Sequence, residues 1–211
     1  MNRLAAAAGV GLLALASGSA MANVRVNTFV IENDDGAPTG GLDIWIEAID
    51  LGSEIELVWH NDSTISANVT DIYIEGNAIS ESALGDATIL NTADVQYSEG
   101  TTPLNPAGSI QFFGGPWKGT TFGADPDTPR PQVNAINPGE SLAIRFTLEG
   151  GATFDDVLAS LNAGEDGFRM AAHVQGLDPN DASLWVVTPA PGAVAPLAIA
   201  GLGLARRRRR A

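Results

Sequence analysis

The chain has 211 residues, 45% of them hydrophobic, with 24 glycines and 12 prolines, which suits one compact domain plus processing segments. Its 25 acidic and 11 basic residues give a net charge of −14, and it contains no cysteine. The acidic excess argues against a nucleic-acid partner because it repels polyphosphate. The lack of cysteine excludes disulfides, Cys-ligated zinc, iron–sulfur clusters and thiol catalysis.

The N-terminal residues have the features of a secretory signal peptide. Arg3 precedes a run of Ala, Gly, Val and Leu, and the small residues Ala20 and Ala22 occupy the positions that signal peptidase requires. We expect cleavage after Ala22. Residues 1–22 are then the signal peptide, and the exported chain begins at Asn23.

From residue 23 to residue 188, hydrophobic residues mostly alternate with polar ones, a two-residue period typical of strands with one buried face. Ile55, Leu57 and Trp59 are an example. The predicted strands cover residues 24–29, 43–48, 54–60, 71–75, 109–113, 141–148, 168–174 and 183–187. Short strands bounded by Gly, Asn, Asp or Pro favour an all-β fold. We predict an antiparallel β-sandwich, of jelly-roll or Ig-like type, over residues 23–188.

One segment departs from this period and predicts a short helix. Thr153 is a candidate N-cap with Asp156 three residues later, the apolar residues that follow share one helical face, and Gly164 is a stop signal. We expect this helix to pack across an open end of the sandwich. Residues 99–138 hold seven prolines, which predicts a long surface loop around the strand at 109–113.

The C-terminal residues 189–211 form a third segment. It consists of Pro189, Ala190, Pro191 and Gly192, then an apolar run to residue 205, then Arg206, Arg207, Arg208, Arg209 and Arg210. The apolar run is shorter than the ~20 residues of a stable membrane-spanning helix. The arginines resist translocation and favour the cytoplasmic side. Together they predict a hydrophobic stop-transfer helix that holds the exported domain at the inner membrane transiently.

This order of a Pro-containing motif, a short hydrophobic stretch and an arginine cluster resembles the PEP-CTERM sorting signal. The resemblance implies processing by exosortase, a membrane transpeptidase of Gram-negative-type bacteria that make extracellular polysaccharide. The family's Pro-Glu-Pro stands here as Pro189-Ala190-Pro191, without the glutamate. Two outcomes are therefore open: recognition by a different exosortase subtype, or a tail retained as a plain anchor.

A more diffuse resemblance covers residues 138–187, whose strand–helix–strand–strand order is similar to that of ectodomains attached to PEP-CTERM tails, and residues 56–71 fit the same pattern. It implies an exported β-rich domain but supplies no activity and no functional residue.

Residues suited to catalysis are few. The two histidines, His60 and His173, are far apart in sequence. We expect His173 in the core or at a strand edge, and His60 at the end of its strand, beside a turn at Asn61 and Asp62. No Gly-x-Ser-x-Gly elbow is present, so nucleophilic catalysis has no support. Paired-carboxylate hydrolysis stays open as an alternative because acidic residues are plentiful, although no feature selects two of the 25.

Calcium is the most plausible metal, because three loops are rich in the oxygen ligands that it accepts. Their acidic residues are Asp34 and Asp35, Asp125 and Asp127, and Asp178 and Asp181. None of the loops has EF-hand spacing, and turns of this composition are common without metal. We therefore predict no cofactor, with structural Ca²⁺ as the alternative.

The four tryptophans are the remaining ligand candidates. Trp59 and Trp185 have apolar neighbours and are expected in the core, whereas Trp45 alternates with acidic residues and is expected to face outward. Trp117 lies in a Gly/Pro-rich loop, so it is the best candidate for stacking on a sugar, with packing back onto the domain as the favoured alternative.

These features predict a non-enzymatic protein of the cell surface or extracellular matrix. Its expected partners are signal peptidase, an exosortase-type transpeptidase, the inner membrane transiently, and the cell envelope or extracellular polysaccharide. The alternatives are a carbohydrate- or calcium-binding module of the polysaccharide matrix, and a secreted hydrolase.

Overall fold

The computed structural model describes residues 22–32, 36–76, 80–100, 117–127, 131–161, 167–178 and 181–188. The predicted strand at 109–113, the tail and all of the predicted signal peptide except Ala22 lie outside these ranges. Within them, no helix is long and apolar enough to cross a membrane.

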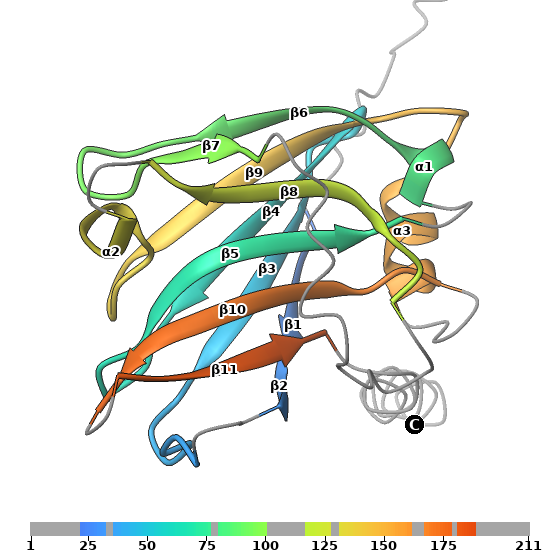
Figure 1. The fold of residues 1–211 in the computed structure, drawn as a ribbon. Helices are drawn as coiled ribbons and strands as arrows, with labels where there is room; N and C mark the ends of the chain where they lie inside the picture. The colour runs from blue at the N-terminus through green and yellow to red at the C-terminus, as the bar shows by residue number, and fades with distance from the viewer. Residues whose placement is uncertain are drawn as a thin grey trace, which may run out of the picture.

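The described part of the chain forms two antiparallel sheets (Figure 1). Sheet A has the order β1 (Asn23–Asn27), β3 (Ile44–Asp50), β4 (Glu54–Asn61), β9 (Ser141–Leu148) and β6 (Leu84–Leu90). Sheet B has the order β2 (Phe29–Glu32), β11 (Ala182–Val187), β10 (Met170–Leu177), β5 (Asn68–Glu75), β8 (Thr120–Pro126) and β7 (Tyr97–Glu99). The predicted all-β fold is confirmed.

The two sheets share one hydrophobic core. The alternation in β4 buries Ile55, Leu57 and Trp59 to 1% exposure or less, as the sequence predicts. Phe122 of sheet B meets Phe146 of sheet A edge to face, with 5.2 Å between the ring centroids. Each large apolar side chain buried in this way contributes about 1.5–3 kcal/mol.

The predicted helix is present as α3 (Phe154–Leu161). Thr153 caps it: its Oγ1 accepts a hydrogen bond from the Asp156 N–H (3.3 Å), and Asp156 Oδ2 accepts one from the Thr153 N–H (2.9 Å). This reciprocal pair is a capping box. Hydrogen bonds from Thr153 also lower the pKa of Asp156 by stabilising its carboxylate. Three apolar residues of the helix, Phe154, Val157 and Leu161, belong to the shared core.

The structure differs from the prediction at the start of the domain. The predicted strand at 24–29 is divided at Thr28 into β1 and β2, which belong to different sheets. The Thr28 hydroxyl donates to the Ile44 carbonyl oxygen (2.5 Å) at this crossover.

Several other elements were not predicted. The segment 99–138, predicted as a long loop, contains β8 and the four-residue helix α2 (Pro131–Asn134). The prediction also missed the helix α1 (Ser80–Ala83) and the strands β6 and β7. In β6 only Leu84 is fully buried, because the strand lies at the edge of sheet A. Such a strand lacks the alternation of hydrophobic and polar residues that indicates a strand with one buried face.

The end of β4 lies one residue beyond the predicted strand. The prediction ends the strand at His60, beside a turn at Asn61 and Asp62, whereas the structure continues it to Asn61. The Asn61 side chain is fully buried, and its Nδ2 donates to the carbonyl oxygens of Ala67 (2.6 Å) and Ile136 (2.9 Å). A buried amide with its donors satisfied fastens two loops to the strand end.

Candidate functional site

Several residues singled out by the sequence lie outside the described ranges: Ala20, Asp34, Asp35, the motif 189–192 and the arginines 206–210. Ala22 is the first described residue, and its carbonyl oxygen accepts a hydrogen bond from the Asp50 N–H (3.0 Å).

The described calcium candidates do not gather into a metal site. Asp125 lies on β8, and Asp127 just after it accepts a hydrogen bond from Ser98 Oγ (2.5 Å). Asp178 and Asp181 belong to the turn between β10 and β11, where Asp181 has a positive φ of 52°. Over the described ranges, no three His, Asp or Glu side chains are grouped so that they could hold a metal ion.

Trp117 is packed onto the domain. Its indole Nε1 donates to Thr120 Oγ1 (3.1 Å), and the guanidinium carbon of Arg169 lies 5.7 Å from the ring centroid. The ring packs with Ile31 and Trp185 against Ala171 and Val187, which form a small hydrophobic cluster. This indole is therefore half-buried and engaged with the protein.

Beneath Trp117 lies a buried ion pair. Glu75 and Arg169 are 1% and 3% exposed, and Arg169 donates through Nε to Glu75 Oε2 (2.7 Å) and through Nη2 to Oε1. Glu75 also accepts the backbone N–H groups of Arg169 (3.1 Å) and Lys118 (3.0 Å). The carboxylate thus fastens the segment that begins at Trp117 to the end of β5.

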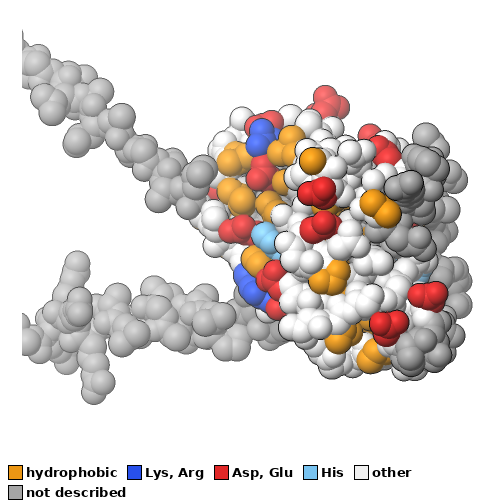
Figure 2. Space-filling model, turned by 90° about the vertical axis from the view of Figure 1, so that its left-hand side faces the viewer, with side chains coloured by type: hydrophobic (Ala, Val, Ile, Leu, Met, Phe, Trp, Pro, Cys, Tyr) orange, Lys and Arg blue, Asp and Glu red, His pale blue; other side chains and the backbone are white. Residues whose placement is uncertain are grey.

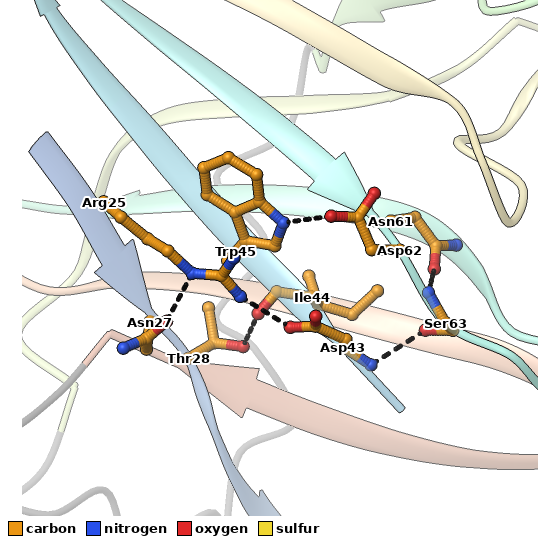
Figure 3. A network of polar contacts seen from close by, with 9 residues as sticks. All are labelled: Arg25, Asn27, Thr28, Asp43, Ile44, Trp45, Asn61, Asp62 and Ser63. Atoms are coloured by element: carbon orange, nitrogen blue, oxygen red, sulfur yellow. Dashed lines mark hydrogen bonds and ion pairs between the residues drawn. The ribbon is translucent and has the colours of Figure 1, made fainter. Parts of the chain in front are cut away.

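On the outer face of sheet A, Trp45 faces outward as predicted, but both faces of its ring are covered. Arg25 of β1 lies 4.2 Å from the ring centroid, and the His60 ring of β4 stacks at 4.0 Å and 9°. Because β1 and β4 flank β3, the two partners approach from opposite sides. The indole N–H donates to Asp62 Oδ2 (2.7 Å), and Arg25 pairs with Asp43 (2.9 Å), as Figure 3 shows.

The outer face of sheet B carries a line of polar and aromatic side chains across four strands. His173 of β10 is paired with Trp185 of β11 on one side and with Asp71 of β5 on the other. Ile72 of β5 is paired with Ala124 of β8, and one further step of this register puts Asp125 opposite Asp71. We call Trp185, His173, Asp71 and Asp125 the polar row. These strands face the viewer in Figure 1.

Contacts within the polar row hold its members in place. The His173 and Trp185 rings stack at 4.6 Å and 14°, and His173 Nδ1 lies 3.1 Å from Asp71 Oδ2. The Thr70 hydroxyl donates to the same Asp71 oxygen (3.0 Å). The Thr70 hydroxyl and the Asp71 carboxylate therefore lie at the same ring nitrogen of His173, Nδ1. In a nucleophilic triad the hydroxyl and the carboxylate lie at opposite ring nitrogens of the histidine. His173 lies on the outer face, half-buried, rather than in the core or at the edge of its sheet.

Tyr73 lies beside the polar row on β5. Its ring is 5.7 Å from Trp185 and tilted by 39°, and the glycine opposite it, Gly123, leaves room for the ring to lean toward β8. Burial, reinforced by the negative charges of Asp71 and Asp125, raises the pKa of Tyr73, so its hydroxyl stays protonated over the physiological range.

The sequence interpretation missed this site. Trp185 was expected in the core, but it lies on the face opposite the buried Leu184 and Val186. The two-residue period of β11 contains this information, although the unbroken run Leu184–Val187 hides it. Nothing in the sequence indicated that residues 71, 125, 173 and 185 lie on neighbouring strands.

Two hollows lie elsewhere, between the edges of the sheets. One, of about 340 Å³, is lined by residues that include Phe29, Leu42 and Val186. The other, of about 460 Å³, is lined by residues that include Asp86 and Glu99. Neither is lined by Trp117 or by the polar row.

Comparison with known proteins identifies no relative: no family model, no curated protein and no solved structure matches this chain. The function therefore has to be argued from the sequence and the geometry.

Asp125 of the polar row should make the stability of the domain depend on pH. Burial raises the pKa of Asp125, and the carboxylates of Asp71 and Asp127 raise it further. Ionised Asp125 therefore costs stability at neutral pH, and the cost disappears as the pH falls through its folded-state pKa. We expect Asp125→Asn to raise the melting temperature at pH 7 by about 1–2 °C, a small gain because the side chain is exposed.

The measurement is thermal melting at pH 7 and pH 4. The gain should shrink at pH 4, where wild-type Asp125 takes up a proton. Asp94→Asn, at an exposed position in a loop, is the control and should show no such pH-dependent gain. A lower melting temperature for Asp125→Asn at pH 7, or an equal gain at both pH values, would contradict the prediction.

Proposed function

We propose that this chain is an exported, non-enzymatic protein of the cell surface or extracellular matrix, sorted at its C-terminus by an exosortase-type system. The observation that carries the proposal is the tail at 189–211, a Pro-containing motif followed by a short apolar run and five arginines. Its position supports this: in the described part of the chain the strands run from Asn23 to Val187, between the two predicted processing segments.

The net charge of the domain argues against a nucleic-acid partner and is compatible with the partners proposed above. Residues 23–188 contain all 25 acidic residues but only five basic ones, so the domain carries −20 (5 − 25). Figure 2 shows acidic side chains spread over one side of the molecule, with the basic side chains of that side next to acidic ones. Such a surface keeps a protein soluble and repels nucleic acid. Signal peptidase, the transpeptidase and the inner membrane act on the two terminal segments.

We further infer that the sandwich is of the Ig-like type. When the strands β3, β4, β5, β6, β9, β10 and β11 are lettered A to G, sheet A contains the order A-B-E-D and sheet B the order C-F-G. This is the strand order of constant-type Ig domains. Folds of this type serve many functions, so the likeness supports an architecture and no activity.

Intact-mass measurement of the protein recovered from its native host tests the proposal. We expect an N-terminus at Asn23 and a C-terminus near Pro191, because signal peptidase and the transpeptidase act at these places. A mature chain that still carries all five arginines would support a retained anchor instead. Full-length, unprocessed protein in the cytosol would refute export.

A further inference from the structure

The polar row and Tyr73 together present hydrogen-bonding groups that the protein does not use. In the described part of the chain, the Trp185 indole N–H, the Tyr73 hydroxyl and the Asp125 carboxylate have no hydrogen-bond partner, nor has Nε2 of His173. Buried aromatic side chains usually pair such polar groups within the protein. The Tyr73 residue is only 5% exposed, so its unpaired hydroxyl is unusual.

These groups are nevertheless accessible. Over the described ranges, the buried side-chain nitrogen or oxygen atoms that lack a partner are Nε2 of His60 and Oγ of Ser160. Neither belongs to the polar row or to Tyr73. The unpaired groups of the row therefore reach the surface, where a ligand can meet them.

We propose that the outer face of sheet B binds a polysaccharide chain without acidic groups, which lies across strands β11, β10, β5 and β8 along the polar row. A sugar chain offers hydroxyl groups, which both donate and accept hydrogen bonds, alternating with apolar C–H surface. The polar row and Tyr73 offer a matching set of groups. The Trp185 N–H donates a hydrogen bond, the Tyr73 hydroxyl can donate or accept one, and the carboxylates of Asp71 and Asp125 accept.

The geometry sets the mode of recognition. The Trp185 and His173 rings are stacked along the cross-strand direction, at close to the ~4.8 Å spacing of neighbouring strands. They therefore stand edge-on to the surface and present ring edges and N–H groups rather than one flat platform. Hydrogen bonds dominate recognition of this kind, which favours particular sugars over apolar ligands in general.

The extent and charge of the row define the ligand further. From β11 to β8 the row spans three strand spacings, about 14 Å, which is longer than one sugar ring. Asp71 and Asp125, with Asp127 nearby, would repel carboxylate or sulfate groups. The site thus suits several consecutive neutral sugars. This inference rests on the proposed function, since export brings the domain to such polymers.

The test is calorimetric titration of the purified full-length protein with cellohexaose, mannohexaose, chitohexaose and, as the acidic comparison, hexagalacturonate. We expect at least one neutral hexamer to bind and hexagalacturonate not to. Tyr73→Phe removes the hydroxyl and keeps the ring, and Trp185→Phe removes the indole N–H and leaves a smaller aromatic ring. Each should weaken binding about 3- to 10-fold, and together about 10- to 100-fold.

Trp45→Phe is the matched control, because Trp45 lies on sheet A and its indole N–H already donates to Asp62. It should leave affinity unchanged, and melting curves should show that all variants fold. The inference is overturned if no neutral hexamer binds at millimolar concentration, if the double variant binds like the wild type, or if hexagalacturonate binds more tightly. Titration in solution does not depend on processing, so either outcome leaves the intact-mass test of export independent.

Discussion

Replacing Arg169 by methionine should lower the free energy of unfolding by about 3–5 kcal/mol, because it leaves the Glu75 carboxylate buried without its cation. In a domain of this size the melting temperature should fall by roughly 6–20 °C. Glu75 keeps the N–H groups of Arg169 and Lys118, which reduce the loss but cannot replace the charge. Urea denaturation of the full-length protein, followed by circular dichroism, measures the change.

Arg145→Met is the matched control. Arg145 also pairs with a glutamate on a neighbouring strand, Glu56, but its side chain is 36% exposed and the pair is open to solvent. Its loss should cost far less than the loss of Arg169, because an exposed ion pair contributes little to stability. If Arg169→Met costs no more than Arg145→Met, the buried pair does not have the role that its burial indicates.

The same ion pair has a structural consequence that reaches the outer face of sheet B. The Lys118 N–H donates to Glu75 and the Gly76 N–H donates to the Gly119 carbonyl, so the chain after Trp117 is held at the end of β5. Trp117 in turn packs in the small cluster that includes Trp185. Loss of the ion pair should therefore loosen one end of the polar row as well as the domain.

The sequence predicted what a two-residue period can encode. It identified the buried face of β4 and the outward position of Trp45, because each depends only on neighbours within one strand. The helix α3 was also predictable, because its capping box is local to Thr153 and Asp156.

What the sequence could not predict depends on strand order. Asp71 and His173 lie 102 positions apart and meet only because β5 pairs with β10. Glu75 and Arg169 meet through the same pairing, and the two isolated charges gave no sign of being buried together. Edge strands such as β6 were missed because no strictly alternating face is buried there.

Trp59→Ala should destabilise the domain by about 3–5 kcal/mol, because it removes the largest fully buried side chain of the core and leaves a cavity. Trp59→Phe fills more of the space and should cost less, which keeps the test informative if the alanine variant does not fold. Melting temperature and urea midpoint are the measurements.

Trp45→Ala on the neighbouring strand is the matched control, since the same residue type is lost from the outward face. Its indole covers Arg25 and stacks on His60, so the change should cost about 1–2 kcal/mol through lost stacking and cation–π contact. The two tryptophans share a residue type but point to opposite faces of sheet A. A loss for Trp45→Ala as large as that for Trp59→Ala would mean that the outer face of this sheet is packed as tightly as the core, and would contradict the assignment of a single core between the sheets.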